Sequence, residues 1–351
     1  KFIMAYTTIN KSTDYFNTVL YTGTGATQTI SGVGHQPDFI WVKQRGDAGY
    51  DHSLHNSVSG LLKQLISNTP TAEITNTDTV TSNNADGFVL GADSAGPNAN
   101  SNNQNTKTYA AWNWKANGQG SSNTVGTINT TYTSANTTAG FSIVSYPGNG
   151  VAGATVGHGL GVAPKVIIIK QLTGATNFTV YHSGLGNFAK YLYLDATNAV
   201  ATDSGNFDNV PNANTFLLGS NNQVNASSGS KYIAYCFAEK QGYSKFGSYT
   251  GNGNANGTFI YTGFKPAWVM VKRSSDSQGW VIWDDKRPGY NLTNQSLTAN
   301  ENGAEETGRT FDILSNGFKI RDTNTATNAS GSTYIYMAFG QSLVGSNNVP
   351  C

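Results

Sequence analysis

Two pairs of adjacent acidic residues could carry hydrolytic chemistry. Asp284 and Asp285 form one pair, and Glu305 and Glu306 form the other. A glycosidase needs two carboxylates that flank the bond it cleaves. Adjacent residues on a strand point to opposite faces, and adjacent acids in a loop usually face solvent. We therefore expect no catalytic residue in this chain. A capsule polysaccharide depolymerase that uses Asp284 or Asp285 is the alternative.

The histidines suggest a metal site at only one place in the chain. His52 and His55 lie close together in the sequence, with Asp51 beside them. A zinc site takes three or four ligands at characteristic spacings, and no further ligands stand at such a spacing here. Residues three apart on a strand also point to opposite faces. We expect neither a metal ion nor a cofactor.

Polar loops raise the question of calcium or phosphate binding. Asp208 and Asp322 lie in loops whose oxygen atoms could bind calcium. Neither loop follows the EF-hand pattern, so turns capped by the Asp side chain are the simpler interpretation. Residues 251–257 are rich in glycine but lack the Gly-Lys-Ser/Thr ending of a phosphate-binding loop. They predict a tight hairpin or a bulge instead.

Aromatic residues beside polar loops indicate a sugar-binding surface. Exposed rings next to hydrogen-bonding groups are typical of such sites. Burial in the core would explain the same rings equally well, because aromatic side chains dominate core packing. The candidate glycan-contacting residues are Tyr50, Trp280, Trp283 and Tyr290.

The strands that would hold these residues in place are indicated by a sequence pattern that occurs three times. Residues 37–43, 164–170 and 266–272 each read Pro, any residue, four large apolar residues and Lys. Such a run is too short for a helix and is rich in β-branched and aromatic side chains, which favours a strand. Apolar residues occupy both side-chain parities, so both faces of the strand should be buried. Each run is predicted to be a central strand.

Other markers accompany each of these runs in a fixed order. A tyrosine before a glycine-rich turn precedes the run, and a phenylalanine and a closing aromatic strand follow it at nearly constant spacing. The tyrosines are Tyr21, Tyr146 and Tyr249, the phenylalanines are Phe88, Phe216 and Phe318, and the closing strands begin at Tyr109, Tyr232 and Tyr334. The pattern predicts an all-β fold of three tandem antiparallel β-sandwich or jelly-roll-like repeat units.

The predicted organisation follows from these markers. The three units span residues 15–118, 140–242 and 243–342. Residues 119–139, nearly all Gly, Ser, Asn and Thr, form the linker, with an edge strand there as the alternative. Residues 1–14 and 343–351 are terminal segments.

Three local expectations accompany this organisation. Residues 59–66 and 190–194 occupy matching places, and the alternation in the second predicts that both are strands. Residues 232–237 should point alternately to two faces.

Composition excludes several classes of protein. Charged residues make up 12% of the chain and the net charge is +1, which leaves no electrostatic footprint for nucleic acid. No apolar run approaches the roughly 20 residues of a transmembrane helix, so we expect no membrane insertion. Cys236 and Cys351 are too few for a disulfide framework, which is consistent with folding in a reducing cytosol. We expect Cys236 to be buried in the closing strand of the second unit.

Several stretches resemble a known group of proteins. They are residues 6–17, 153–164, 232–238, 242–253, 316–320 and 334–339. Through them the chain resembles tail-fibre-like virion structural proteins of tailed bacteriophages, especially marine and environmental ones. The resemblance spans nearly the whole chain and carries no catalytic residues.

The resemblance implies a non-enzymatic structural component of a virion, a fibre or appendage subunit made in the host cytoplasm. Its partners would be other virion proteins and host surface polysaccharide. Identical chains would form a homo-oligomer, with a trimer favoured, through the polar loops, the linker and the terminal segments 1–17 and 343–351. The alternative function is a carbohydrate-binding adhesin on a phage tip or a bacterial surface.

Overall fold

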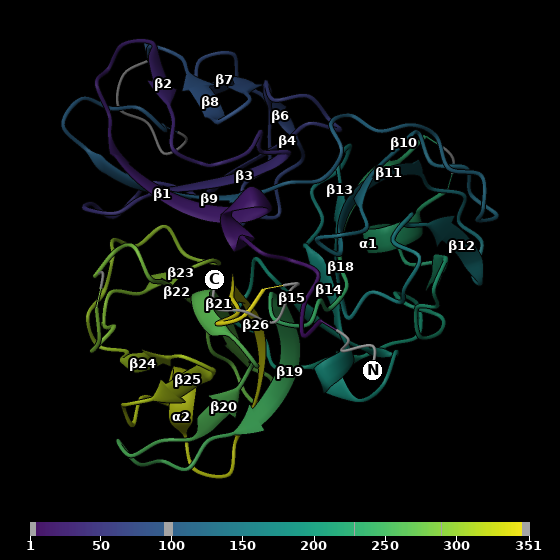
Figure 1. Cartoon of the computed structure of the whole chain (residues 1–351). Coiled ribbons are helices and arrows are strands. Elements are labelled where there is room, and N and C mark those ends of the chain that lie inside the picture. Colours follow the sequence, from purple (N-terminus) through teal and green to yellow (C-terminus); the bar gives the residue numbers. More distant parts are fainter. Residues whose placement is uncertain (1–4, 95–100, 228, 289, 346–351) are drawn as a thin grey trace.

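The computed structural model of the chain describes residues 5–94, 101–227, 229–288 and 290–345. It is 41% strand and 4% helix, and its paired strands are antiparallel (Figure 1). The predicted all-β class is confirmed. The helical pieces are short: α1 (Asn222–Asn225), α2 (Thr325–Asn328) and the 3-10 turns η1 (Ser12–Asp14) and η2 (Ser183–Leu185).

Three large sheets contain the same order of four strands. The first sheet runs β1 (Phe16–Thr22), β9 (Thr108–Trp114), β3 (Phe39–Gln44) and β4 (Ser53–Asn56). The second contains β11 (Phe141–Pro147), β18 (Lys231–Phe237), β13 (Val166–Gln171) and β14 (Thr179–His182), with β10 (Tyr132–Asn136) on one side and β15 (Lys190–Tyr193) and β16 (Ala201–Thr202) on the other. The third runs β19 (Ser244–Thr250), β26 (Thr333–Gln341), β21 (Lys265–Arg273), β22 (Trp280–Asp284) and β23 (Leu297–Thr298).

The Pro-led runs form β3, β13 and β21, and each has a hydrogen-bonded strand on both sides. Every residue of β3 and β13 is buried. The prediction that these runs are central strands with two buried faces is confirmed.

A small sheet covers the outer face of each large one. The small sheets are β2 (Gln28–Ile30), β8 (Gly87–Leu90) and β7 (Val80–Asn84), then β12 (Ala154–Gly157) and β17 (Thr215–Leu218), then β20 (Phe259–Tyr261), β25 (Gly317–Ile320) and β24 (Phe311–Leu314). Phe88, Phe216 and Phe318 belong to these small sheets and are buried against the large ones. We call the resulting layers the first, second and third sandwich. A further pair, β5 (Lys63–Gln64) and β6 (Ile74–Thr75), flanks the first.

The inner faces of the three large sheets share one hydrophobic core. Strand β18 shows why: Tyr235 and Phe237 belong to the shared core, whereas Ala234 and Cys236 point into the core of the second sandwich. The predicted alternation of this strand is confirmed. Because each large sheet is apolar on both faces, one face packs on its small sheet and the other on the neighbouring sandwiches. The three sandwiches therefore surround a common centre (Figure 1).

Residues 59–66 are not the predicted strand. Only Lys63–Gln64 is a strand, and the preceding residues form turns. The Asn56 side-chain oxygen accepts a hydrogen bond from the Ser59 backbone N–H at 2.8 Å, and Gly60 has a φ of 93°. This positive φ starts a turn that an apolar spacing in the sequence does not reveal. The matching segment, Lys190–Tyr193, is a strand as predicted.

The linker and the N-terminal segment pack more closely on the rest of the chain than expected. Within residues 119–139, β10 pairs with β11, and Ile128 bridges Val156. The edge-strand alternative is therefore correct. In the N-terminal segment, Ile9 is part of the shared core and Phe16 begins β1. The predicted boundaries of the units stay predictions.

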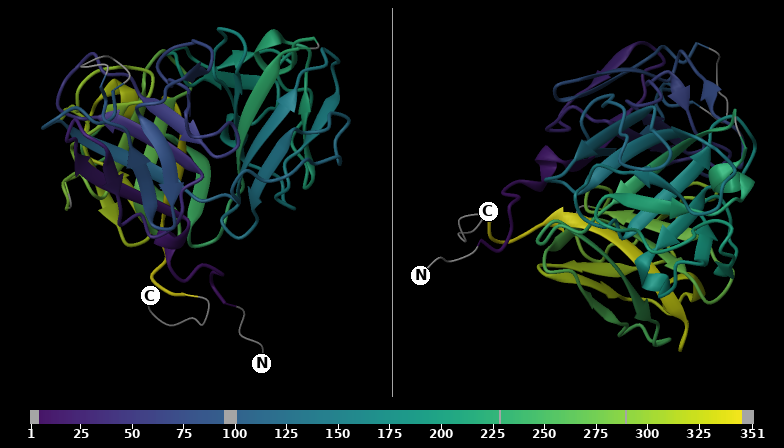
Figure 2. Two further views of the ribbon diagram at one scale, coloured as in Figure 1. Left: turned by 90° about the horizontal axis from the view of Figure 1, so that it is seen from above. Right: turned by 90° about the vertical axis from the view of Figure 1, so that its right-hand side faces the viewer.

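The described ends of the chain lie side by side and leave from the same side of the molecule (Figure 2). The Ser12 backbone N–H donates to the Gln341 side-chain oxygen at 2.6 Å, and the Gln341 amide donates to the Asn10 carbonyl at 3.1 Å. Cys351 lies outside the described residues. Within the described ranges, no helix combines the length and apolarity needed to cross a membrane.

Candidate functional site

Three equivalent backbone hydrogen bonds close the sandwiches into a ring. In each, a loop of one sandwich donates to the carbonyl two residues beyond the lysine of the next Pro-led strand. The bonds run from Glu73 to Leu172 at 3.1 Å, from Val200 to Ser274 at 2.9 Å and from Glu305 to Arg45 at 2.8 Å. The first sandwich thus contacts the second, the second the third, and the third the first. We call these three contacts the seams.

A buried polar residue reaches across each seam. Asn56, His182 and Asp284 end the equivalent strands β4, β14 and β22. Asn56 donates to the Tyr235 hydroxyl at 3.2 Å, His182 Nε2 lies 3.1 Å from the Tyr336 carbonyl oxygen, and Asp284 accepts from Trp112 Nε1 at 2.9 Å. One structural position is therefore filled by three different side chains. Asp284 and His182 tie sandwiches together and do not face solvent.

His182 has a defined protonation in this arrangement. Its Nδ1 accepts a hydrogen bond from the Gly184 backbone N–H at 3.0 Å, so its Nε2 carries the proton and donates to Tyr336. Burial lowers the pKa of the imidazole to about 4. His182 is therefore neutral at pH 7.

The seam between the third and first sandwiches contains buried charges. Arg287 Nε donates to Asp284 Oδ2 at 2.8 Å, and both side chains are fully buried. Glu305 accepts from Arg287 at 3.3 Å and from Arg45 Nε at 2.9 Å. Glu306 forms a separate ion pair with Arg309 at 2.7 Å. Three of the four carboxylates in the two acidic pairs, those of Asp284, Glu305 and Glu306, therefore form ion pairs with arginines.

The two neighbouring histidines are also structural. His52 accepts from Trp41 Nε1 at 2.9 Å through Nδ1, and its Nε2 lies 3.0 Å from the Thr298 carbonyl oxygen across a seam. His55 lies 2.8 Å from the Ser53 hydroxyl and 2.8 Å from the Leu61 carbonyl oxygen. Burial lowers the pKa of both imidazoles. Within the described ranges, no three His, Cys, Asp or Glu side chains gather closely enough to hold a metal ion.

The lysines that end the Pro-led strands form a buried set of three. Burial lowers the pKa of Lys43, Lys170 and Lys272 to about 8 in each case. Lys170 donates to the Pro70 carbonyl oxygen at 2.8 Å, and Lys272 donates to the Thr197 carbonyl oxygen at 3.0 Å, each across a seam. The ammonium groups of Lys170 and Lys272 thus find backbone acceptors in a loop of the neighbouring sandwich, as buried polar groups generally do.

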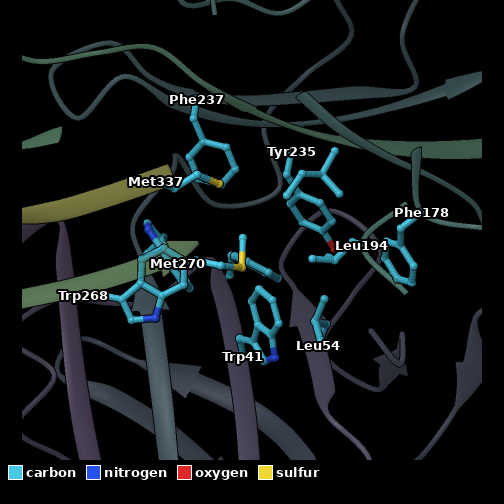
Figure 3. Close-up of a pocket in the computed structure, with 12 residues that line it drawn as sticks. Trp41, Leu54, Phe178, Leu194, Tyr235, Phe237, Trp268, Met270 and Met337 are labelled. Carbon is cyan, nitrogen blue, oxygen red and sulfur yellow. The ribbon is translucent and has the colours of Figure 1, made fainter. Parts of the chain in front are cut away.

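The centre of the ring is packed and apolar. Its cavity has a volume of about 10 Å³ and is lined by rings and aliphatic side chains, including Trp41, Tyr235, Trp268 and Met270 (Figure 3). A water molecule needs roughly 10–15 Å³ and two or more polar partners, so the cavity is too small and too apolar to bind a ligand. It is part of the shared core.

Two of the four predicted glycan-contacting residues are in the wrong place for that role. Trp283 is 0% exposed and packs against Phe311, and Trp280 is 2% exposed. Each indole N–H donates to a backbone carbonyl, from Trp280 to Tyr193 at 2.8 Å and from Trp283 to Arg309 at 3.1 Å. Neither ring can contact a glycan, because both fill cores.

The other two predicted residues are accessible to different degrees. Tyr50 is half-buried, and its hydroxyl donates to Gln104 at 3.1 Å. Tyr290 is 80% exposed, the largest exposed fraction among the large apolar and aromatic residues of the described chain. The structure does not bring the four residues together, since Trp280 and Trp283 lie in different cores. Tyr290 lines a pocket.

That pocket lies in the third sandwich, beyond the end of β22. Its volume is about 80 Å³, and its lining consists of Lys265, Asp285, Tyr290, Asn291, Thr293 and Ile313. Desolvation raises the pKa of the Asp285 carboxyl. Among the described residues, Asp285 Oδ1 has no hydrogen-bond partner although it is buried. This pocket is the candidate functional site.

Asn291 fixes the wall of the pocket beside Tyr290. Its side-chain amide donates to the Ile313 carbonyl oxygen at 2.8 Å, and its oxygen accepts from the Ile313 N–H at 2.9 Å. Lys265, Asn291 and Ile313 were missed by sequence reasoning. They come from separate strands and loops. Among the lining residues, only Asp285, as a possible acid, and Tyr290, as an aromatic residue beside polar loops, could be picked out from the sequence.

The loops considered for calcium are capped turns. Asp322 Oδ1 accepts from the Asn324 N–H at 2.9 Å and from the Thr327 hydroxyl at 2.7 Å. In the loop of Asp208 the capping side chain is that of Asn212, whose oxygen accepts from the N–H groups of Asn214 and Thr215, each at 2.8 Å. Residues 251–257 do not form the predicted tight hairpin, because β19 and β20, which they join, lie in different sheets. They form a loop in which Asn252 and Asn254 cap successive turns.

The fold and its contacts define an all-β protein of three sandwiches around a shared core. The chain belongs to the family described as Domain of unknown function (DUF7483), which matches residues 11–342. No curated protein and no solved structure matches the chain.

Proposed function

We propose that this chain is a non-enzymatic structural component of a bacteriophage virion, a fibre or appendage subunit. The observation that supports this most is the use of Asn56, His182 and Asp284 at the seams. His182 and Asp284, which could do acid–base chemistry, hold the ring together instead. A closed ring with a packed centre gives a rigid body, which suits a part of a particle that must keep its shape.

The resemblance of residues 6–17, 153–164 and 242–253 to phage structural proteins supports the place in the virion. The low charge supports assembly, because few like charges oppose contact between copies. We propose a homo-oligomer, with a trimer favoured, that contacts other virion proteins through its polar loops. The two described ends of the chain lie on one side of the molecule, where they are hydrogen-bonded to each other. The loops on the other sides are therefore available for these contacts.

Mass spectrometry of purified phage particles tests this proposal. The chain should be present at a fixed number of copies per particle, and antibodies against it should label an appendage in electron micrographs. Native mass spectrometry of the extracted assembly should give a multiple of the chain mass. Absence from purified particles would contradict the proposal, and a strictly monomeric species would remove the oligomer.

Two alternatives are separated by activity on polysaccharide. A carbohydrate-binding adhesin is favoured by Tyr290, whose ring is exposed at the mouth of a pocket. A depolymerase would release reducing ends from host capsule and lose this activity on Asp285→Asn. Asp284 is less informative here, because its removal would also disturb a seam.

A further inference from the structure

We propose that the pocket of Lys265, Asp285 and Tyr290 binds a neutral pyranose unit of a bacterial surface polysaccharide. This inference rests on the proposed function only in the choice of bacterial glycans as ligands. It names one site and one class of ligand, which the resemblance does not do.

The size of the pocket fits one edge of a sugar ring. A volume of about 80 Å³ is several times the roughly 10–15 Å³ that a cavity needs to hold one water molecule. It admits two neighbouring hydroxyl groups but not a whole pyranose. The remainder of the ring would lie outside, against the exposed ring of Tyr290. Aromatic rings at binding sites give a large apolar contact area to the C–H face of a sugar.

The charges of the pocket suit hydroxyl groups. Asp285 Oδ1 is buried without a hydrogen-bond partner among the described residues, and Oδ2 lies 3.9 Å from Lys286 Nζ. The Asp285 side chain as a whole is 26% exposed, and a carboxylate is a strong hydrogen-bond acceptor, so Asp285 can accept from a sugar hydroxyl. Lys265 lines the same pocket as a donor. Among the lining residues, the Asp285 carboxylate and the Lys265 ammonium balance each other, which favours a neutral ligand; Lys286 lies outside this lining.

The second sandwich provides an internal comparison. The N–H of Ser183 donates to the Lys165 carbonyl oxygen, as the N–H of Asp285 donates to that of Ala267, so Ser183 and Asp285 are equivalent. A pocket lies at this place in the second sandwich too, lined by Ala163 and Ser183 among others. Ala163 stands there in place of Lys265. Lys165 and the buried Tyr181 also line this pocket, whose volume is about 350 Å³, but among the described residues its lining has no carboxylate and no exposed aromatic ring. The carboxylate and the exposed tyrosine therefore distinguish the third sandwich, and the Ser183 pocket is the control.

Binding by the purified full chain tests the inference. The probes are an array of bacterial capsule and O-antigen polysaccharides, and methyl glucoside, galactoside and mannoside in saturation-transfer NMR. Wild type should bind at least one probe. Asp285→Asn and Tyr290→Ala should each weaken that binding by about ten- to a hundred-fold, as expected for a lost hydrogen bond to a charged group or a lost ring contact.

Two control variants should bind like wild type within about two-fold, a difference that is small on the free-energy scale of binding. Ser183→Ala alters the equivalent pocket of the second sandwich, and Tyr261→Ala removes a ring that is exposed on β20. The inference would be overturned by no binding to any probe at about 50 mM, well above weak millimolar affinities. Equal loss in the controls, or binding unchanged in Asp285→Asn, would also overturn it. Particle mass spectrometry does not depend on these results, so the two proposals can fail separately.

Discussion

Replacing Asp284 with Ala should destabilise the protein more than any other single change at a seam. The substitution leaves the buried guanidinium of Arg287 and the indole N–H of Trp112 without their 2.8 Å and 2.9 Å partners. Removing one member of a buried ion pair costs about 3–5 kcal/mol. Glu305 stays 3.3 Å from Arg287 and partly compensates its charge. We therefore expect a loss of about 3–4 kcal/mol in the free energy of unfolding.

The assay is guanidinium unfolding followed by far-UV circular dichroism, because Trp112 fluorescence would report the local change. Asn56→Ala at the equivalent position of another seam is the control. It removes neutral hydrogen bonds to Tyr235 and Ser59 and should cost about 1–2 kcal/mol. A loss below about 1 kcal/mol for Asp284→Ala, or one no larger than that of Asn56→Ala, would refute the assignment of a buried ionic seam.

Three further predictions concern the core and its titrating groups. Trp268→Ala in the shared core should cost about 3–5 kcal/mol in chemical unfolding, because the cavity left by a buried ring cannot collapse fully. The folded pKa of His182 is about 4, below its ordinary 6.5, so its contribution to stability is complete above pH 6.5 and is lost as the pH falls toward 4. His182→Gln should reduce the loss of stability over that interval, measured by unfolding at each pH. The Cys236 thiol is buried with a raised pKa, so in a Cys351→Ser background iodoacetamide should label Cys236 only after unfolding.

The fold class and the central strands could be predicted because their signals are local. Each Pro-led run predicts a strand with two apolar faces. The markers around the three runs follow in the same order at nearly constant spacing, which predicts three similar units. The partners against which the two faces of each large sheet pack could not be predicted in the same way. One apolar face of β18 packs in its own sandwich and the other in the shared core, but the sequence shows only that both are apolar. The turn after Asn56 was missed because a side-chain hydrogen bond and a glycine with positive φ create it.

The candidate site could be predicted only in part. Tyr290 was named because it stands beside polar residues, yet the same reasoning also named Trp280 and Trp283, which are buried. The local sequence around an aromatic residue does not show whether its ring is buried, because buried and exposed rings occur in similar local sequences. The seam position is still harder to predict from the sequence. Asn56, His182 and Asp284 occupy the same structural position, but their side chains differ in chemistry.

Hydrogen exchange of the backbone amides in β9, β18 and β26 tests the shared core most directly. These three strands occupy equivalent places in the large sheets, one in each sandwich. If one core unites the sandwiches, the slowest amides of all three strands exchange through the same global opening. We predict opening free energies that agree within about 1 kcal/mol and fall together in Asp284→Ala. Three separate values, or a fall confined to β26, would show that the sandwiches are independent and would contradict the ring.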